Sequence, residues 1–179
     1  MGIIPDDEKE LYLYGFFILF SNFFYSLISI IIGIVFGNVV ASILLYALFA
    51  FVRSYSGGFH ASKESHCILI TIGSLILSNS GVLFLSSHGG CLSKLILIFS
   101  GTTVFFLSPL ESSEKPLSKE EQKHCKNSAR IIVILYMLMA CIAVAHNYYM
   151  FASVISMSLS LECFVLWVGK YQRSQCVVK

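Results

Sequence analysis

Long apolar stretches without a charged residue dominate the chain. Residues 11–52 contain no Asp, Glu, Lys or Arg, and because a bilayer-spanning helix needs about 17 to 25 apolar residues, this run holds two spans. Further uncharged runs cover 65–93, 95–110 and 131–161. We therefore predict six helices, with Gly37-Asn38 as the turn between the first two. The helices are expected at residues 20–36, 38–52, 67–86, 91–108, 129–146 and 149–168.

This pattern predicts an all-α polytopic membrane protein with about six transmembrane or membrane-embedded helices. Several predicted helices are short, which is compatible with tilted, re-entrant or interfacial segments. The composition agrees, because 56% of the residues are apolar and 12% are charged, against about 25% charged in a typical soluble domain. A net charge of +2 with scattered basic residues gives no sign of nucleic-acid binding. The lipid bilayer is the expected surrounding.

Lys and Arg residues gather on one side of the predicted helices. If the N-terminus is cytoplasmic, eleven of the twelve fall on the cytoplasmic side and only Lys94 on the other. Cytoplasmic enrichment of basic residues therefore places both termini and residues 53–66 in the cytoplasm. The whole of 1–179 is predicted to be one membrane-embedded domain. It comprises an N-terminal interfacial segment at 1–19, a candidate catalytic loop at 53–67 and a basic cytoplasmic loop at 109–130.

Residues 53–67 differ in chemistry from everything around them. This stretch carries two His, one Cys, paired glycines and a Glu between two predicted membrane helices, and such polar density beside a bilayer suggests a site. Cys67 stands where an apolar helix begins. The positive end of a helix and a nearby His both favour the reactive thiolate. Cys67 is therefore a candidate nucleophile.

His60 is the preferred base for Cys67. On an unbroken helix a separation of seven residues is about 10 Å, so the chain must bend between the two, and Gly57-Gly58 supplies the freedom to do so. The rival base, His66, is adjacent to Cys67, and neighbouring helical residues do not face each other. Glu64 can orient an imidazole or simply lie in solvent.

Other interpretations of this polar stretch stay open. Its His, Cys and Glu donors suit zinc, but no second Cys/His pair follows at zinc-finger spacing and HExxH is absent. A non-enzymatic transporter or assembly factor would carry Cys67 incidentally and place polar groups near mid-membrane, where Asn79, His146 and Glu162 are the candidates. An acyltransferase that uses Cys67 differs from a peptidase only in its acyl donor.

Two further expectations concern single residues inside apolar runs. Glu162 is costly within a membrane helix and is expected to face protein or water, near His146 or Asn147. The six cysteines form no CxxC pair, so disulfides are not implied. Cys91, Cys141 and Cys163 are interpreted as small packing residues.

The arrangement Arg53…Gly57-Gly58-Phe59-His60-Ala61…Cys67, in a polytopic chain of this size, resembles the accessory gene regulator B family. This is a family of bacterial membrane cysteine endopeptidases that process the precursor of a cyclic autoinducer peptide. Pro109 and Glu114-Lys115-Pro116-Leu117 resemble a weaker family pattern, in which a Pro ends the fourth helix and Lys-Pro-Leu follows. The order of helices matches over nearly the whole chain, but close residue matching is confined to 53–67 and 109–117.

The resemblance implies that Cys67 is the nucleophile and that His60 is its base and then its acid. It implies cleavage of the C-terminal part of a quorum-sensing precursor through a Cys67 thioester, followed by thiolactone or lactone cyclisation. The reaction would occur at the cytoplasmic side of the bacterial cell membrane. No cofactor, metal or third catalytic residue is implied, and a homodimer stays open.

The expected substrate-binding residues are Arg53, Gly57, Gly58, Glu64 and Lys115. Arg53 can bind a substrate carboxylate or place its charge at the membrane surface at the end of the second helix. Lys115 belongs to a basic stretch that can attract an acidic peptide tail or lipid headgroups. These roles are expectations for the structure to test.

Overall fold

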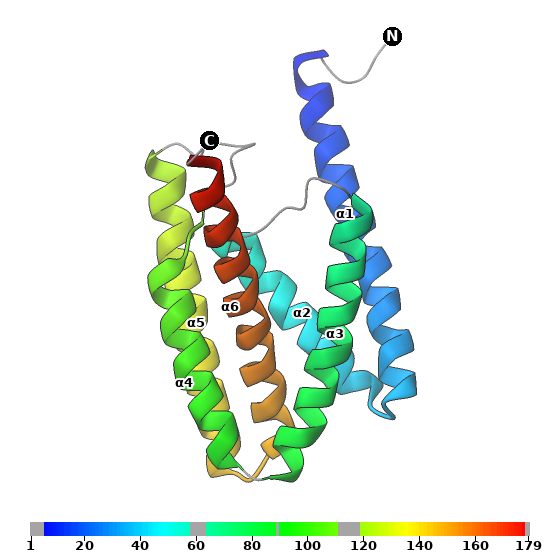
Figure 1. Cartoon of the computed structure of the whole chain (residues 1–179), viewed down its shortest axis with the longest axis vertical. Coiled ribbons are helices and arrows are strands. Elements are labelled where there is room, and N and C mark those ends of the chain that lie inside the picture. Colours follow the sequence, from blue (N-terminus) through cyan, green and yellow to red (C-terminus); the bar gives the residue numbers. More distant parts are fainter. Residues whose placement is uncertain (1–5, 58–63, 89, 111–118, 178–179) are drawn as a thin grey trace.

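A computed structural model describes the chain except for residues 1–5, 58–63, 89, 111–118 and 178–179 (Figure 1). Within the helices, the side chains of residues 6–11, 14, 64–67, 90 and 172–177 are also outside the description. Six helices make up the described part of the chain. They are α1 (Asp6–Val35), α2 (Val39–Ser56), α3 (Glu64–Ser87), α4 (Gly90–Leu107), α5 (Lys119–Ala145) and α6 (Tyr149–Val177).

The prediction of an all-α polytopic membrane protein is confirmed. Five described helices are long and apolar enough to cross a membrane, and the remaining one is apolar but shorter, at Cys91–Leu107. Several helices extend beyond the predicted bounds. α1 begins at Asp6 instead of residue 20, and α5 begins at Lys119 instead of residue 129. In α5 the added residues are polar, and Glu, Gln and Lys favour helical backbone even where hydropathy is low. In α1 the added residues include the apolar stretch 11–19, which continues the first span towards the N-terminus.

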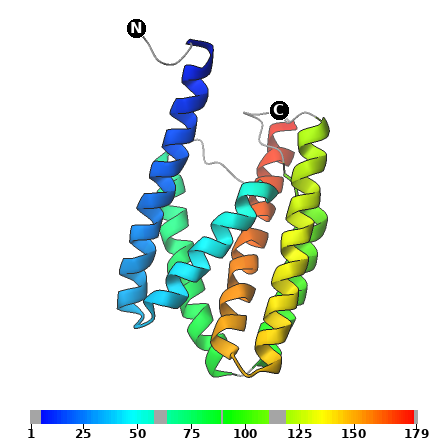
Figure 2. The ribbon, with the colours of Figure 1, turned by 180° about the vertical axis from the view of Figure 1, so that it is seen from behind.

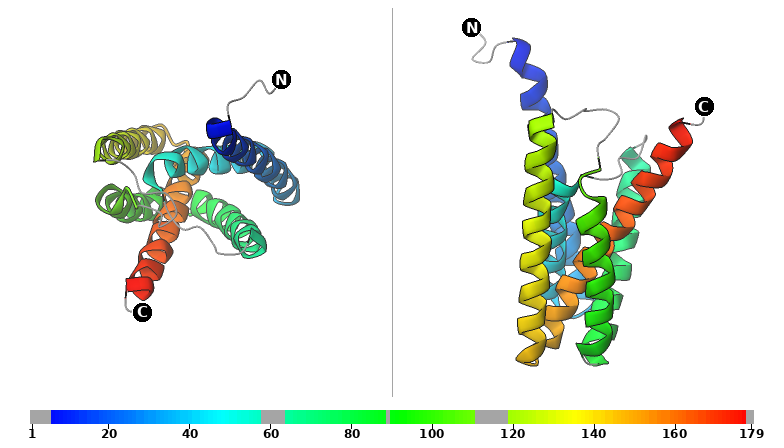
Figure 3. Two further views of the ribbon diagram at one scale, coloured as in Figure 1. Left: turned by 90° about the horizontal axis from the view of Figure 1, so that it is seen from above. Right: turned by 90° about the vertical axis from the view of Figure 1, so that its left-hand side faces the viewer.

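Helix α6 occupies the centre of the bundle (Figure 1, Figure 2). It contacts α2, α3, α4 and α5, whereas α1 lies at the edge against α2 and α3. α2 crosses the bundle obliquely, and the lower part of α6 passes between the other helices when the bundle is viewed along its length (Figure 3). α6 is therefore the element on which the others are assembled.

The two ends of the bundle differ in their connections. α1 begins and α6 ends at one end, which also holds the end of α2 and of α4 and the start of α3 and of α5 (Figure 1). We call it the terminal end. The opposite end, called the turn end here, holds the short links after α1, α3 and α5. Gly37 and Asn147 adopt positive φ angles of 70° and 63° in two of these links, as tight turns require.

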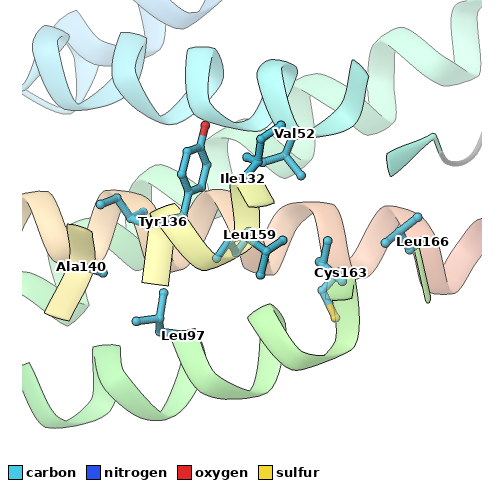
Figure 4. Packing of buried hydrophobic residues seen from close by; sticks show 11 residues of the cluster. Val52, Leu97, Ile132, Tyr136, Ala140, Leu159, Cys163 and Leu166 are labelled. Atoms are coloured by element: carbon cyan, nitrogen blue, oxygen red, sulfur yellow. The ribbon is translucent and has the colours of Figure 1, made fainter. Parts of the chain in front are cut away.

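The buried apolar residues form two clusters on either side of α6. One joins α2, α4, α5 and α6 and includes Val52, Val133 and Leu159 (Figure 4). The other joins α1, α2, α3 and α6 and includes Leu45 and Leu75. Large apolar side chains also cover the outside of the helices. This outward distribution suits a surface that faces lipid.

Serine hydroxyls connect helices at the turn end. Ser29 Oγ donates to Ser42 O at 2.7 Å, and Ser42 Oγ donates to Ser29 O at 2.7 Å, which ties α1 to α2. Ser156 Oγ donates to Ser93 O at 3.1 Å and ties α6 to α4. At Gly33, an added Cβ would come within 2.6 Å of Val39 Cα. Small residues thus let these helices approach closely, as in other membrane bundles.

Candidate functional site

The structure describes only part of the predicted site. Arg53 and Gly57 lie at the terminal end of α2, and Cys67 lies in the first turn of α3. His60, Gly58 and Lys115 lie outside the described residues, as do the side chains of Cys67 and Glu64. The Cys67–His60 pair and the binding roles of these residues therefore stay predictions. What the structure does define is the frame around them.

Gly57 joins the two segments that carry the family resemblance. The backbone N–H of Leu110 donates to Ser56 O at 2.9 Å, and Gly57 and Leu110 form an isolated parallel bridge. Gly57 has a φ of 73°, and a Cβ added there would overlap the carbonyl oxygen of Leu110. Only glycine meets both conditions without strain. Gly57 therefore holds residues 53–57 against the start of 109–117. This role differs from the backbone flexibility that the sequence suggested for the glycine pair.

Glu162 on α6 is fully buried next to this bridge. Ser56 Oγ donates a hydrogen bond to Glu162 Oε1, and the Arg53 guanidinium is near enough to interact electrostatically with the carboxyl group. Within the described part of the chain, Glu162 Oε2 has no hydrogen-bond partner. A buried carboxyl group with one incompletely paired oxygen is costly and uncommon.

The expectation that Glu162 lies near His146 or Asn147 is wrong. Those residues are exposed at the turn end, whereas Glu162 lies about 20 Å along α6 from its start at Tyr149. The helical rise therefore carries the carboxyl group away from them towards the terminal end. Sequence reasoning missed its partner, Ser56, although that serine directly precedes the glycine pair.

A small cleft lies one helical turn from Cys67. It has a volume of about 20 Å³, enough for about one water molecule. Position 67 precedes Thr71 by four residues, so helical periodicity places both on the same face of α3. The cleft is lined by Phe49 and Arg53 of α2, by Ile70, Thr71 and Ser74 of α3, and by Phe164 and Val165 of α6.

The other conspicuous hollow in the described structure lies elsewhere. It has a volume of about 400 Å³ and sits at the turn end, between the beginnings of α2 and α6. Its lining is apolar apart from Asn38 and Tyr148. The larger space is therefore separated from the predicted site by most of the length of the bundle.

Basic side chains pack against aromatic rings at the terminal end. The Arg130 guanidinium carbon lies 4.7 Å from the centroid of the Phe105 ring, and that of Arg53 lies 5.6 Å from the Phe49 ring centroid. These distances are typical of cation–π contacts. Residues 119–130, predicted as part of a basic loop, form the first turns of α5. Lys119, Lys123 and Lys126 are exposed there.

The mid-membrane polar groups of the transporter hypothesis do not converge. Asn79 Nδ2 donates to Leu75 O of its own helix at 2.9 Å, Glu162 accepts from Ser56, and His146 is exposed at the turn end. The zinc alternative concerns side chains that the structure does not describe. Among the side chains it does describe, no three His, Cys, Asp or Glu lie together as metal ligands.

The cysteines expected to be packing residues divide into two groups. Cys163 is buried in the cluster around α6, as expected. Cys91 and Cys141 are exposed on their helices, so their interpretation as packing residues is wrong. The physical reason is that an apolar run has lipid-facing positions as well as buried ones, and the sequence does not distinguish the two.

Comparisons with known proteins give a consistent result. The model of the family Accessory gene regulator B matches residues 1–166. A protein of Clostridium perfringens (strain SM101 / Type A) named "Putative AgrB-like protein" is 26% identical over 173 residues, covering 90% of this chain and 79% of its own. Another, from C. perfringens (strain 13 / Type A) and named "Putative AgrB-like protein 2", is 23% identical over 152 residues, covering 80% and 70%.

No solved structure matches the chain. The family match covers most of the chain and includes both segments joined at Gly57. It supports a role in the processing of an autoinducer peptide in quorum sensing. Together with the helical membrane architecture, this match shows that the chain belongs to the accessory gene regulator B family.

Proposed function

We propose that the protein is a membrane cysteine endopeptidase that cleaves a quorum-sensing precursor peptide and promotes its cyclisation. The observation that carries the proposal is the Gly57–Leu110 bridge. It joins the segment that leads towards His60 and Cys67 to the segment that leads towards Lys115. Two stretches far apart in the sequence, each of which resembles the family, thus meet at one end of the bundle.

The proposed reaction uses Cys67 as nucleophile and His60 as proton carrier. His60 takes the thiol proton, the Cys67 sulfur attacks the scissile carbonyl carbon, and the carbon–nitrogen bond breaks as protonated His60 gives its proton to the leaving amine. The product is a thioester between Cys67 and the shortened peptide. The side chain of an internal Cys or Ser of the peptide then attacks the thioester and releases the Cys67 thiol. The product is a thiolactone or a lactone, and no ATP is needed.

Substrate recognition is assigned to residues around this pair. Arg53, beside the cleft, binds a peptide carboxylate, and Lys115 draws the acidic part of the precursor to the same end of the bundle. Gly58 lets the peptide backbone approach closely, Gly57 contributes by holding its segment against Leu110, and Glu64 orients the His60 imidazole. The site lies on the cytoplasmic side of the bacterial cell membrane, where the basic residues concentrate.

Substitution of the two catalytic residues tests the proposal. Cys67→Ala should abolish cleavage of the precursor, and His60→Ala should nearly do so, because an unassisted thiol is only a few per cent thiolate near pH 7. Cys91→Ala and Cys141→Ala are matched controls, since both cysteines are exposed on helix surfaces, and they should cleave normally. Cleavage is measured with purified proteins, after each variant has been shown to insert into the membrane to the same extent as the wild type. Normal cleavage by Cys67→Ala would contradict the peptidase proposal.

A trapped intermediate separates the cyclising peptidase from a hydrolase. A precursor whose internal nucleophile is replaced by Ala should accumulate as an adduct on Cys67, because its acyl group lacks an intramolecular acceptor. Neutral hydroxylamine should release that adduct, as it does a thioester. If the wild-type precursor gives only linear peptide carrying oxygen from labelled water, the cyclisation part of the proposal is wrong.

A further inference from the structure

Glu162 is an unexpected residue for the centre of a membrane bundle. Its side chain is fully buried, and burying a carboxyl group in an apolar environment is among the most expensive substitutions a membrane helix can carry. Replacing a buried polar pair by well-packed apolar side chains is often neutral or stabilising. Stability alone therefore does not account for a carboxyl group at this position.

The contacts of Glu162 lead to the backbone bridge between the two matched segments. Its Oε1 accepts from the hydroxyl of Ser56, the last residue of α2. The carbonyl oxygen of the same serine accepts the backbone N–H of Leu110 at 2.9 Å, and the next residue, Gly57, forms the bridge. One residue thus receives contacts from α6 and from the segment that follows α4.

The side chain of Ser56 is also tied to its own helix. Ser56 Oγ lies 3.0 Å from Val52 O, so one hydroxyl proton has two acceptors, Val52 O and Glu162 Oε1. Without the carboxyl group, the hydroxyl can turn fully to Val52 O, and the hydrogen bond from Ser56 at the end of α2 to α6 is lost. Glu162 therefore draws the Ser56 hydroxyl from a contact within α2 to a contact between α2 and α6.

We propose that Glu162 is a positioning residue that acts through Ser56. It holds the end of α2 against α6, and so sets the Gly57–Leu110 bridge that keeps the two segments together for peptide processing. This inference rests on the proposed function for its catalytic consequence. Its structural consequence, the protection of the bridge, can be measured without any peptide substrate.

Three variants distinguish this role from simple packing. Glu162→Gln keeps the side-chain length and a carbonyl acceptor for Ser56, whereas Glu162→Leu removes the acceptor, and Ser56→Ala removes the donor. Ser158→Ala is the matched control. Ser158 is a buried serine on the same helix, one turn away, whose hydroxyl donates only to its own helix at Ile155 O, at 2.8 Å.

Turnover of the precursor gives the first readout. Glu162→Leu and Ser56→Ala should each lower kcat by about tenfold or more with KM nearly unchanged, as expected for loss of a buried hydrogen bond that leaves its partner unsatisfied. The double variant should be no worse than the poorer single variant, because both remove one contact. Glu162→Gln should stay within about threefold of wild type if an acceptor is what matters. A Glu162→Gln protein as impaired as Glu162→Leu would overturn the hydrogen-bond role.

Hydrogen exchange at Leu110 gives the second readout. The Leu110 amide is bonded to Ser56 O, so in full-length protein in bilayer discs it should exchange about tenfold faster in Glu162→Leu and Ser56→Ala, and at the wild-type rate in Ser158→Ala. Unchanged Leu110 protection in both variants would overturn the inference, even if the wild type cleaves precursor normally. Faster exchange in a protein without Cys67-dependent cleavage would support the positioning role and reject the proposed function. If Glu162→Leu does not accumulate, Ser56→Ala and Glu162→Gln decide both readouts.

Discussion

Buried polar groups are treated differently at the two ends of the bundle. At the turn end, Ser29 and Ser42 satisfy each other's carbonyl oxygens, and the Ser156 hydroxyl reaches across to Ser93. At the terminal end lie the three buried polar side-chain atoms that have no hydrogen-bond partner among the described residues. They are Ser108 Oγ, Arg130 Nε and Glu162 Oε2.

The difference separates polar groups whose contacts are complete from polar groups that are incompletely paired among the described residues. Reciprocal serine contacts cost little in an apolar surrounding because every donor finds an acceptor. Incompletely paired groups cost more, and membrane proteins retain them mostly where they function. The unpaired atoms lie at the end of the bundle that also holds the Gly57–Leu110 bridge. This contrast is consistent with the proposal that the terminal end carries the site and that the turn end supports it.

The largest expected contrast between the ends is their exposure to opposite sides of the membrane. In a cysteine-free background, an impermeant thiol reagent should label Ser87→Cys, near the turn end, in intact cells. Ser62→Cys should react only after permeabilisation, because basic residues concentrate on the cytoplasmic side. Labelling of both positions from outside would contradict the assignment of the terminal end to the cytoplasm.

The next largest effect is expected at Gly57. Gly57→Ala places a Cβ against Leu110 O at a φ of 73°, and such strain costs about 2 kcal/mol or more, equivalent to about a thirtyfold loss of the bridged conformation. Cleavage should fall by at least that factor. Gly73→Ala on α3 is the control, because no atom lies within 4 Å of its added Cβ. Equal activity of the two variants would contradict a required bridge.

A smaller effect should follow loss of the cation beside the cleft. Arg53→Ala should raise KM for an acidic precursor by about tenfold, as expected for one partly screened charge contact. Added salt should raise the wild-type KM and change that of the variant much less. Lys94→Ala, at the turn end, should leave KM unaltered. If the KM of Arg53→Ala still rises with added salt, other cationic side chains make the contact with the precursor.

The smallest effect is expected at the turn end. Ser42→Ala removes the hydroxyl that donates to Ser29 O and should lower the free energy of unfolding by about 1 kcal/mol. Precursor cleavage by the folded protein should be unchanged. Thermal unfolding in detergent and a turnover assay measure the two quantities on one sample. Loss of turnover without loss of stability would contradict a purely structural role for the turn end.

The sequence predicts the helices well and their arrangement poorly. Charge-free runs locate all six helices, because the length of an apolar run is fixed by the thickness of the bilayer. The central position of α6 could not be predicted, since lipid and protein interior are both apolar and hydropathy does not mark the buried face. Exposed Cys141 and buried Cys163 occupy similar apolar runs for the same reason.

For the candidate site, the structure can be compared with the sequence only in the frame around the predicted residues. The spacing of Arg53, Gly57 and Cys67 was sufficient to suggest the family, which the family model then confirmed. The Ser56–Glu162 contact spans 106 positions of the sequence, and no local pattern indicates which serine a distant carboxyl group will meet. Gly57 was predicted for its flexibility, but its structural need is space for Leu110 and a positive φ, both set by tertiary contacts.

The central position of α6 has a consequence for how the protein is made. During synthesis, the helix that contacts four others leaves the ribosome after all four of them. Until it inserts, α2, α3, α4 and α5 lack the contacts that α6 makes with each of them, and the hydroxyl of Ser56 lacks the Glu162 carboxyl group. The bundle therefore cannot close progressively from its N-terminus. Insertion of α6 completes both apolar clusters and the Ser56–Glu162 contact in one step. A chain truncated before α6 should therefore remain open in the bilayer as a target for membrane quality control.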